Sequence, residues 1–500
     1  MLAAPRADLV ANTLEFENQP LVKPTGFREY DARWILGTEL NLLGVEVLGL
    51  GLGTYLHELG QRRVVVAHDY RSYSLSIKQA LSLGLLQAGC EVLDIGMAVT
   101  PIAYFAQFDL EAPCVAMVTA SHNENGWTGV KMGCQPPLTF GPDEMGRLKQ
   151  IVLGAEGQTR SGGSLTHVDG VQERYVKDAA ARAHIKRPLK VVVACGNGAA
   201  GAFAPEAIRR MGVPVVIETD CQLDYTFPRY NPNPEDHKML LAMAEAVHVH
   251  KADLALGFDG DGDRCGVVDD KGREIFADKI GLMLARDLSG LHADATFVVD
   301  VKSTGLFLTD PVLKANGAKT VYWKTGHSYI KRKTAEIGAL AGFEKSGHFF
   351  FAPPHGRGYD DGLVAAAAIL SMLDRNPGKS LSELHDALPV AYSSLTMSPH
   401  CADETKYGVV EQIVAEYEAV AASGATILGR KIAQVLTVNG VRVTLEDGSW
   451  LLVRASSNKP ELVVVVESAR SDDDMRALFR DEVKPRLARH PEVGAYNQEI

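Results

Sequence analysis

The chain has 500 residues, of which 46% are hydrophobic and 23% charged, and its formal net charge at pH 7 is −11. These values are typical of a globular protein, and the length corresponds to roughly three or four domains of about 100–200 residues each. Because the charge is negative and basic residues form no run of five or more, we expect neither nucleic acid nor an anionic membrane as a partner.

The sequence also bears on the compartment. The longest apolar stretches, residues 42–56 and 363–373, are interrupted by glycine or charge or are too short to cross a bilayer. The N-terminal segment lacks the basic, apolar and small-residue order of a secretory signal. Seven cysteines without a CxxC pair are typical of reduced thiols. We therefore predict a cytoplasmic protein.

Short β-branched runs, each followed by a turn and a helical pattern, recur through most of the chain. The predicted strands include residues 62–67 (RRVVVA), 189–194 (LKVVVA) and 295–300 (ATFVVD). Gly89 and Gly212 are placed to end the helices that follow the first two. Alternating strand and helix signals indicate α/β layers with a largely parallel sheet.

The stretch MVTASHNENGWTGVK (117–131) interrupts this pattern with polar residues. Its serine, Ser121, is open to three interpretations: a nucleophile, a helix cap or part of a surface turn. The absence of a GxSxG elbow gives no support to an α/β-hydrolase. Lys131, the cation that follows, suits chemistry on an anion.

Residues 196–201 (GNGAAG) match the GxGxxG fingerprint between a predicted strand and a helix, and Glu218 follows about 20 residues later. This pattern suggests an NAD-dependent oxidoreductase. The alternative is a close strand-to-helix turn that needs glycine for its backbone conformation.

The stretch GFDGDGDRCG (257–266) alternates Asp259, Asp261 and Asp263 with glycine and continues with Arg264. Carboxylates that converge in this way repel one another unless a cation lies among them, and their hard oxygens favour Mg²⁺ or Ca²⁺. An EF-hand is excluded, because arginine stands at the sixth loop position and the flanking segments are predicted strands. The alternative is an exposed acidic turn without a ligand.

The C-terminal block has a different pattern. Residues 441–445, 450–454 and 462–467 are predicted strands joined by tight turns, and Ser471 is the predicted N-cap of a helix that begins with Asp472 to Asp474. This order predicts an α+β domain with an antiparallel sheet.

The stretch RASSNKP (454–460) joins two of these strands. Its arginine, hydroxyl and amide side chains, together with turn N–H groups, would suit a phosphate. A polar hairpin loop without a ligand is the alternative.

Together these motifs resemble the α-D-phosphohexomutase family, specifically its phosphomannomutase/phosphoglucomutase branch, from FREYDAR (27–33) to the C-terminal block. The family pattern TASHNP, followed by a lysine, is similar to TASHN (119–123) and Lys131, which implies that Ser121 is the phosphoserine. The family's metal loop DGDGDR is similar to residues 259–264, which implies that the three aspartates and Ser121 hold Mg²⁺.

Three further motifs support the resemblance: DVKST (300–304), TGHSYIK (325–331) and FEKSGH (343–348), the last being similar to the family's sugar loop GE-x-SGH. The resemblance implies two groups of site residues: Ser121, Lys131, His327 and Arg33 for catalysis, and Tyr30, Arg264, Lys302, Glu344, Ser346, His348, Arg454, Ser456, Ser457 and Asn458 for substrate binding. The general acid or base stays open among His327, Lys131, Arg33 and His348.

The implied fold has three similar mixed or parallel α/β domains and a C-terminal α+β domain, similar to the TATA-box-binding fold, around a central cleft. The predicted domains are residues 1–165 with the phosphoserine loop, 166–275 with a Rossmann-like sheet and the metal loop, 276–393 with the sugar-binding loop, and 394–500 with the phosphate-binding loop.

The resemblance implies an intramolecular phosphotransferase that interconverts hexose 1-phosphate and hexose 6-phosphate, of mannose, glucose or both. The implied partner is a small phosphosugar, with a hexose 1,6-bisphosphate as intermediate and activator. The nearest alternative is a phosphoglucosamine mutase, whose sugar loop more often reads GEQSGH where this chain has Lys345. A sugar-phosphate binder without activity would have lost the serine or an aspartate, and the dinucleotide interpretation is disfavoured because the family's second domain binds none. The oligomeric state is not defined by the sequence.

Overall fold

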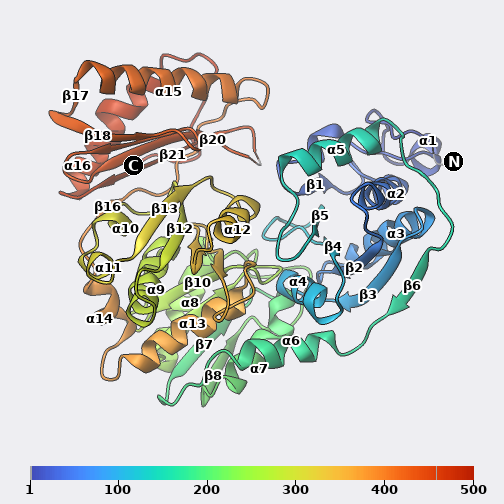
Figure 1. The fold of residues 1–500 in the computed structure, drawn as a ribbon, viewed down its shortest axis with the longest axis horizontal. Coiled ribbons are helices and arrows are strands. Elements are labelled where there is room, and N and C mark those ends of the chain that lie inside the picture. Colours follow the sequence, from blue (N-terminus) through green and yellow to red (C-terminus); the bar gives the residue numbers. More distant parts are fainter. Residues whose placement is uncertain (1–2, 458) are drawn as a thin grey trace. The chain divides into compact units, whose positions relative to one another are not determined.

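The structure, a computed structural model, describes residues 3–457 and 459–500. The chain, whose helices and strands are labelled in Figure 1, divides by its internal contacts into two compact units. The first unit contains the residues up to Ala277 together with Ser346–Glu383, and the second contains Asp278–Lys345 and Leu384–Ile500.

The first unit begins with a six-stranded sheet of order β1-β5-β4-β2-β3-β6. Its strands are β1 (Ala32–Ile35), β2 (Arg63–His68), β3 (Glu91–Met97), β4 (Cys114–Val118), β5 (Trp127–Cys134) and β6 (Ser164–His167). Strand β2 runs parallel to β3 and β4, whereas β5 runs antiparallel to β1 and β4. The carboxyl ends of β2 and β4 therefore meet at one edge of the sheet.

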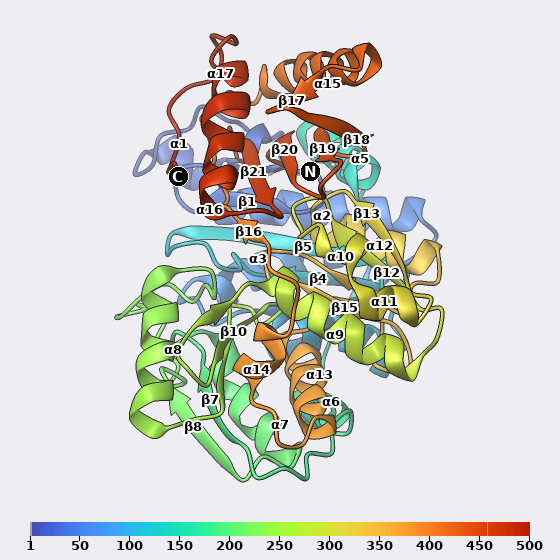
Figure 2. The same cartoon turned by 90° about the vertical axis from the view of Figure 1, so that its left-hand side faces the viewer.

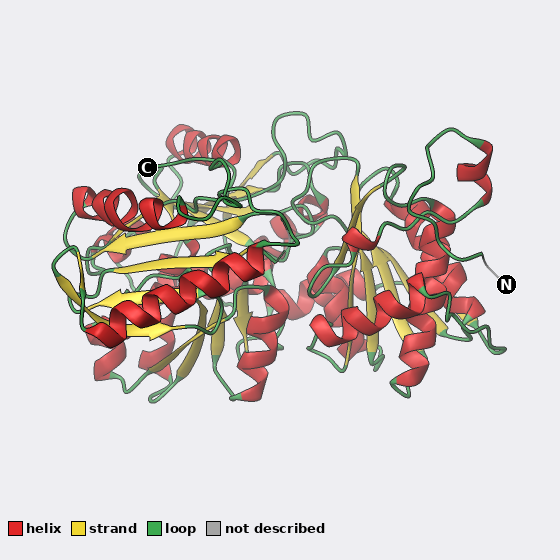
Figure 3. Cartoon of the chain, turned by 90° about the horizontal axis from the view of Figure 1, so that it is seen from above, coloured by secondary structure: helices red, strands yellow, loops and turns green. Residues whose placement is uncertain are grey.

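Helices cover both faces of this sheet (Figure 3). The helical segments of this part are α1 (Leu14–Asn18), η1 (Pro24–Gly26), α2 (Leu42–Glu58), α3 (Ser74–Gln87), α4 (Thr100–Asp109) and α5 (Pro142–Leu153). Alternate strand residues such as Val64, Val66 and Ala116 form one core cluster with α2, α3 and α5. Because successive strand residues face opposite sides, the residues between them face the other side, where α4 contacts β2 and β4.

A second sheet of the same unit has the order β11-β10-β9-β7-β8. Its strands are β7 (Lys190–Ala194), β8 (Val215–Thr219), β9 (Leu254–Phe258), β10 (Cys265–Asp269) and β11 (Glu274–Ile275), and the accompanying segments are α6 (Val171–Ala180), η2 (Ala199–Ala202), α7 (Ala204–Arg210), α8 (His237–His250), β15 (Phe349–Phe351) and α13 (Gly362–Arg375). Strand β7 is parallel to β8 and β9, while β10 returns antiparallel to β9. The tight β9–β10 connection holds the acidic loop.

The second unit contains a parallel layer of order β13-β12-β14. Its elements are α9 (Ala277–Leu291), β12 (Thr296–Asp300), α10 (Leu306–Thr309), α11 (Pro311–Ala315), β13 (Lys319–Trp323), α12 (His327–Glu336) and β14 (Ala341–Phe343); α14 (Leu381–Asp386) precedes the last sheet. Since β12 is parallel to both β13 and β14, the loops that follow the three strands leave from the same edge of the layer.

The last sheet is antiparallel, with the order β16-β21-β20-β19-β18-β17. Its elements are β16 (Tyr392–Ser393), α15 (Lys406–Ser423), β17 (Thr426–Ile427), β18 (Arg430–Leu436), β19 (Val441–Leu445), β20 (Trp450–Ala455), β21 (Leu462–Ser468), α16 (Asp472–Ala477), the π-helical turn η3 (Leu478–Val483) and α17 (Lys484–Leu487). Alternate residues such as Val443, Val453 and Val464 pack against α15 and the C-terminal helices (Figure 2). The opposite face contacts the β12 layer through Arg442 and Glu467.

The strands predicted at residues 62–67, 189–194, 295–300 and in the C-terminal block are confirmed to within one or two residues. Ser471 caps α16 as predicted, with its hydroxyl accepting from the Asp474 N–H. The domain boundaries stay predictions. Within the described residues, no helix combines the length and apolar character needed to span a bilayer.

Glycine lets α2 and α3 cross closely. A Cβ on Gly49 would lie 2.2 Å from the carbonyl oxygen of Leu81, and one on Gly84 would lie 2.1 Å from that of Glu46. Carbonyl oxygens of a packed helix cannot retreat without moving the backbone. The two glycines therefore set the distance between these helices.

We predict that Gly84→Ala lowers the free energy of unfolding by about 1–3 kcal/mol, because the added methyl group overpacks the crossing. Chemical denaturation measures the change. Gly146→Ala is the matched control, because Gly146 lies on α5 with nothing within 4 Å of an added Cβ. There we expect a gain of about 0.5–1 kcal/mol from helix propensity. Equal stability of Gly84→Ala and the wild type would contradict the close crossing.

Candidate functional site

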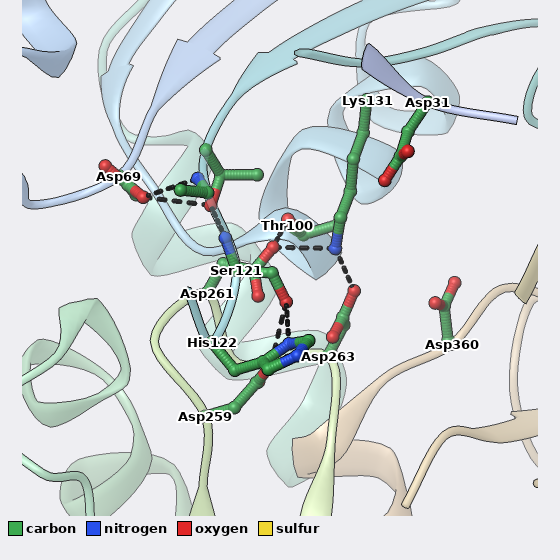
Figure 4. A network of polar contacts seen from close by, with 12 residues as sticks. Asp31, Asp69, Thr100, Ser121, His122, Lys131, Asp259, Asp261, Asp263 and Asp360 are labelled. Carbon is green, nitrogen blue, oxygen red and sulfur yellow. Dashed lines mark hydrogen bonds and ion pairs between the residues drawn. The ribbon is translucent and has the colours of Figure 1, made fainter. Parts of the chain in front are cut away.

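Ser121 follows β4 with a left-handed backbone, φ 52°, which is uncommon for a residue other than glycine. Its N–H donates to Thr119 Oγ1 (2.9 Å), and that hydroxyl donates to Asp69 Oδ2 (2.9 Å). Arg71 donates to the Ser121 carbonyl oxygen (2.9 Å) and is itself paired with Asp69. Backbone strain of this kind persists only where the surroundings over-determine it. The loop is thus built to hold one hydroxyl in place (Figure 4).

The β9–β10 loop brings Asp259, Asp261 and Asp263 to this hydroxyl (Figure 4). All three are fully buried, and one oxygen from each lies within 4.8 Å of the others. Glycine permits the approach, because a Cβ on Gly260 would lie 2.5 Å from the Ser121 carbonyl oxygen. The alternation of aspartate and glycine read in the sequence therefore has a packing cause, and the exposed-turn interpretation is wrong.

The serine and the lysine both contact this cluster. Ser121 Oγ donates to Asp259 Oδ2 (3.2 Å). Lys131, from β5, donates to Asp261 Oδ2 (2.7 Å) and also to Asp263. Ser121 and Asp259, which are 138 residues apart in the sequence, are thus in direct contact.

The negative charge of the three carboxylates is not balanced by the neighbouring cations, as the pKa values of the aspartates indicate. Burial, followed by the charges of Asp261 and Asp263, raises the pKa of Asp259 to about 8. Burial and the Asp261 charge also raise the pKa of Asp263. Burial would raise the pKa of Asp261 as well, but the charge and hydrogen bond of Lys131 prevail and lower it. Lys131 contacts two of the three carboxylates, yet the pKa values of Asp259 and Asp263 stay raised, so its charge does not balance the cluster.

The donor set fits a divalent cation. Asp261 Oδ1 and Asp263 Oδ1 are buried and accept no hydrogen bond from any residue that the structure describes. Buried polar atoms are rarely left in this state without a ligand. Clustered carboxylate oxygens suit hard cations such as Mg²⁺. These three aspartates could therefore hold such an ion.

Arg264 lies at the end of the same loop and is held by a histidine. Its Nε donates to His348 Nε2 (3.0 Å), and its backbone N–H donates to Asp259 Oδ1 (3.3 Å). Because an arginine can only donate, Nε2 is the acceptor, so the proton of a neutral His348 ring is on Nδ1. That atom lies 3.1 Å from Asp360 Oδ2. An aspartate, a histidine and an arginine thus form a chain beside the cluster.

Arg33 reaches the serine loop from β1. Its guanidinium donates to Asn123 Oδ1 (2.9 Å) and pairs with Asp31 (2.8 Å). Tyr30, three residues earlier, is buried. Ser346 is half-buried in the segment before β15. The first unit therefore contains the predicted residues Ser121, Lys131, Asp259, Asp261, Asp263, Arg264, Arg33, Tyr30, Ser346 and His348.

The second unit contains two predicted substrate-binding residues and the predicted catalytic histidine. Lys302 follows β12, His327 begins α12, and Glu344 follows β14. All three are buried, and Glu344 Oε1 accepts from the Gly326 N–H at 2.7 Å. The loops after three adjacent parallel strands thus carry one predicted ligand each.

The predicted phosphate loop connects β20 to β21 in the same unit. The Arg454 side chain is buried and donates to the Ala455 carbonyl oxygen (2.7 Å). Ser456 Oγ accepts from the Lys459 N–H (3.3 Å), while Ser457 is half-buried. Asn458 lies outside the described residues. These contacts place an arginine and a hydroxyl at the start of the hairpin loop.

The GxGxxG turn has no room for a dinucleotide. The Ala199 N–H donates to the carbonyl oxygen of Gly260 (3.2 Å) in the acidic loop. A Cβ on Gly201 would lie 2.1 Å from the Cys221 carbonyl oxygen. In the dinucleotide fingerprint these glycines allow backbone to approach pyrophosphate, whereas here they approach other backbone. The close-turn interpretation holds.

The sequence did not single out three residues that support the site. Asp69 follows β2 and anchors the serine loop, Thr100 donates to Asp261 Oδ2 (2.6 Å), and Asp360 faces His348. For Asp69 the available signal was its position after a buried strand, in HDYRS. For Asp360 it was the acidic pair in GYDDGL before a helix, whose second member caps α13.

A buried hydroxyl in contact with a cation-binding carboxylate cluster, with lysine and arginine beside it, defines a site suited to phosphoryl transfer, which depends on positioning and charge neutralisation. Family models agree with this class. Those described as phosphoglucomutase/phosphomannomutase match four successive parts: the alpha/beta/alpha domains I (residues 24–158), II (173–272) and III (276–392), and the C-terminal domain (402–484).

Individual relatives agree over nearly the whole length. A phosphomannomutase/phosphoglucomutase of Pseudomonas aeruginosa is 33% identical over 468 residues, which cover 93% of this chain and 96% of the relative. A phosphoglucomutase of Neisseria meningitidis is 31% identical, with coverage of 88% and 92%. A crystal structure of a phosphoglucomutase/phosphomannomutase family protein from Burkholderia thailandensis superposes with a TM-score of 0.84 at 30% identity, with coverage of 95% and 99%.

The chain belongs to the phosphoglucomutase/phosphomannomutase family. The predicted family, the fold class of α/β domains followed by an α+β domain, and the reaction class of an intramolecular phosphotransferase are confirmed. The oxidoreductase alternative is thereby removed.

We predict that Mg²⁺ raises the melting temperature, because it binds the folded cluster and not the unfolded chain. At about 100 times its Kd the gain would be about 2.7 kcal/mol. Calorimetry with and without MgCl₂ measures it, and Asp263→Asn should remove most of the shift. Asp94→Asn is the control, since Asp94 is a buried carboxylate paired with Lys78 outside the cluster. Equal shifts in both variants would show that the effect is not specific to the cluster.

Proposed function

We propose that the chain interconverts hexose 1-phosphate and hexose 6-phosphate, with glucose and mannose as sugars, through a phosphoryl group carried on Ser121. The observation that supports this most strongly is the 3.2 Å contact between Ser121 Oγ and Asp259 within the buried carboxylate cluster. A serine that served only as a turn residue would need neither the strained backbone nor the cation site.

The reaction needs two transfers, because the oxygens on C1 and C6 of one hexose are too far apart for a direct exchange. In the first transfer, the bond between phosphorus and Ser121 Oγ breaks, a bond from phosphorus to the free sugar hydroxyl forms, the hydroxyl proton passes to a base, and the leaving Oγ takes up a proton. The product is a hexose 1,6-bisphosphate, which then turns end for end. In the second transfer, the bond between the other phosphorus and its sugar oxygen breaks, a bond from that phosphorus to Oγ forms, and the proton of Oγ is transferred to the sugar oxygen, so the phosphoserine is regenerated.

Residues around Ser121 would stabilise the charge of the transfer. When bound to Asp259, Asp261 and Asp263, Mg²⁺ would supply positive charge beside the leaving Oγ. Lys131 and Arg264 add fixed cations, and a unit charge about 4 Å away contributes roughly 4 kcal/mol at an effective dielectric constant near 20. Arg33, held by its contact with Asn123, and His327 are the proposed groups for orienting and deprotonating the sugar hydroxyl.

The remaining predicted residues would recognise the sugar phosphate. Arg454, Ser456, Ser457 and Asn458 are proposed to hold the phosphate that does not react, with arginine and hydroxyl donors of the type that phosphate prefers. Glu344 and Ser346 would bind the hydroxyls at C3 and C4, which both orientations of the sugar present in similar places. Tyr30, Lys302 and His348 would complete the contacts.

We predict that Ser121→Ala lowers kcat on the order of 1000-fold or more, as expected for loss of a nucleophile. A coupled assay with glucose 1-phosphate and added bisphosphate measures this. Mass spectrometry of the freshly purified wild type should find one phosphoryl group on the peptide that contains Ser121. Ser82→Ala is the control, because Ser82 is a buried serine that donates to the Lys78 carbonyl oxygen away from the cluster. A tenth of wild-type activity in Ser121→Ala would refute the role of this serine.

We also predict comparable kcat/KM for glucose 1-phosphate and mannose 1-phosphate. These sugars differ only at C2, and contacts to C3 and C4 would not distinguish them. Parallel assays with both substrates measure the ratio. A preference beyond about 1000-fold, equivalent to roughly 4 kcal/mol, would mean that the C2 hydroxyl is recognised directly.

A further inference from the structure

Asp300 is a fully buried residue at the end of the central strand β12, and none of the motifs above assigns it a role. Its carboxylate accepts hydrogen bonds from three separate loops. Oδ1 accepts from Ser303 Oγ (2.5 Å) and from the Lys345 N–H (3.2 Å), and Oδ2 accepts from Thr325 Oγ1 (3.0 Å).

Each of these loops carries one of the proposed site residues. Lys302 directly precedes Ser303, His327 follows Thr325 by two residues, and Glu344 directly precedes Lys345. The second and third loops are also joined directly, by the hydrogen bond from the Gly326 N–H to Glu344. One carboxylate therefore connects the three positions.

The parallel sheet explains how one residue reaches all three loops. In the β13-β12-β14 layer, Asp300 pairs with Trp323 at the end of β13, and Val299 pairs with Phe343 at the end of β14. The carboxyl ends of all three strands thus lie at the same level, where open α/β sheets bind ligands. Strand β12 is hydrogen-bonded to both of the other strands of this parallel layer, so its end lies between theirs.

The chemistry of the three partners requires an acceptor with two oxygens. Two of the donors are hydroxyls and one is a backbone N–H. A carboxylate only accepts, whereas the amide of asparagine would turn an NH₂ group toward at least one donor. Replacing Asp300 by asparagine keeps the volume and removes part of the network.

The loop that carries Lys302 is held from a second side. Arg442 of β19 donates to the carbonyl oxygens of Val301 (2.6 Å) and Ser303 (2.7 Å), on either side of Lys302. Its guanidinium lies against the rings of Tyr322 and Trp450, 4.2 and 3.7 Å from their centroids. With the backbone of this loop held on both sides, the Asp300 hydrogen bonds determine where the neighbouring loops stand relative to it.

We propose that Asp300 is a positioning residue for sugar binding: it sets the relative positions of Lys302, His327 and Glu344 without touching the substrate. This inference depends on the proposed roles of Lys302 and Glu344 in binding the hexose phosphate and of His327 in orienting or deprotonating its hydroxyl. Loss of the Asp300 carboxylate loosens the loops against one another, so the sugar is bound less tightly and His327 is less well placed, while the phosphorylation of Ser121 is unaffected.

The test compares Asp300→Asn with the wild type in steady-state kinetics on glucose 1-phosphate. We expect KM to rise about 10- to 100-fold, in line with the cost of small misplacements in binding groups, with phosphorylation of Ser121 unchanged by mass spectrometry. Titration calorimetry in a Ser121→Ala background, with and without Asp300→Asn, should show the same loss in Kd without turnover.

Two further variants keep the proposal testable if Asp300→Asn folds poorly. Ser303→Ala and Thr325→Val each remove one donor and should raise KM by a smaller factor. The matched control is Asp310→Asn, since Asp310 is another fully buried aspartate of this unit, which caps α11 and pairs with Arg286. It should lower the melting temperature and leave KM unchanged.

Two results would overturn the proposal: an unchanged KM in Asp300→Asn and in both donor variants, or an equal rise in Asp310→Asn. Failure of the proposed function is distinguishable, because then the wild type itself would show no turnover of glucose 1-phosphate and no phosphoryl group on Ser121.

Discussion

The site in the first unit depends on one constraint: three carboxylates are buried beside a single serine hydroxyl. Three aspartates with no exposed surface offer oxygens within 4.8 Å of one another, an arrangement that is unfavourable in a medium of low dielectric constant unless cations compensate. Lys131 supplies part of this compensation, and a divalent ion could be held by the two carboxylate oxygens that accept no hydrogen bond from the described residues. The glycines of the loop and the strained backbone of Ser121 follow from the same constraint, because hydroxyl and carboxylates must meet without intervening side chains.

Aspartates at the ends of parallel strands hold neighbouring loops in place in both units. Asp69 follows β2 and accepts from Thr119 in the loop that leaves the neighbouring strand β4. Asp300 ends β12 and accepts from loops that follow β13 and β14. In both units a carboxylate on the inner strand joins loops from adjacent strands. The same arrangement holds the Ser121 loop in one case and the loops of the proposed sugar-site residues in the other.

The two units contain residues with different proposed roles, phosphoryl transfer and sugar recognition. Most residues of the proposed transfer chemistry, from Arg33 to Arg264, belong to the first unit. Lys302, Glu344, Arg454 and the proposed base His327 belong to the second. The segment FEKSGH contributes to both, since the second unit ends its portion at Lys345 and the first resumes at Ser346. The proposed sugar-recognition residues thus lie mainly on a parallel layer and an antiparallel sheet that share a buried face through Arg442 and Glu467.

The sequence alone determined the elements and the chemistry of the motifs. β-branched runs, an N-cap at Ser471 and alternating glycine and aspartate are local patterns, and each formed as its local energetics dictate. Tertiary structure alone decided which distant groups meet. The GNGAAG motif matches a dinucleotide fingerprint, but in the structure its turn packs against the backbone of Gly260. In the sequence, Asp69, Asp300 and Asp360 look like ordinary polar residues at strand ends or in loops, and only the folded sheets bring their partners to them. Hydrogen bonds between strand-end loops depend on strand order and register, which are long-range properties that no local pattern encodes.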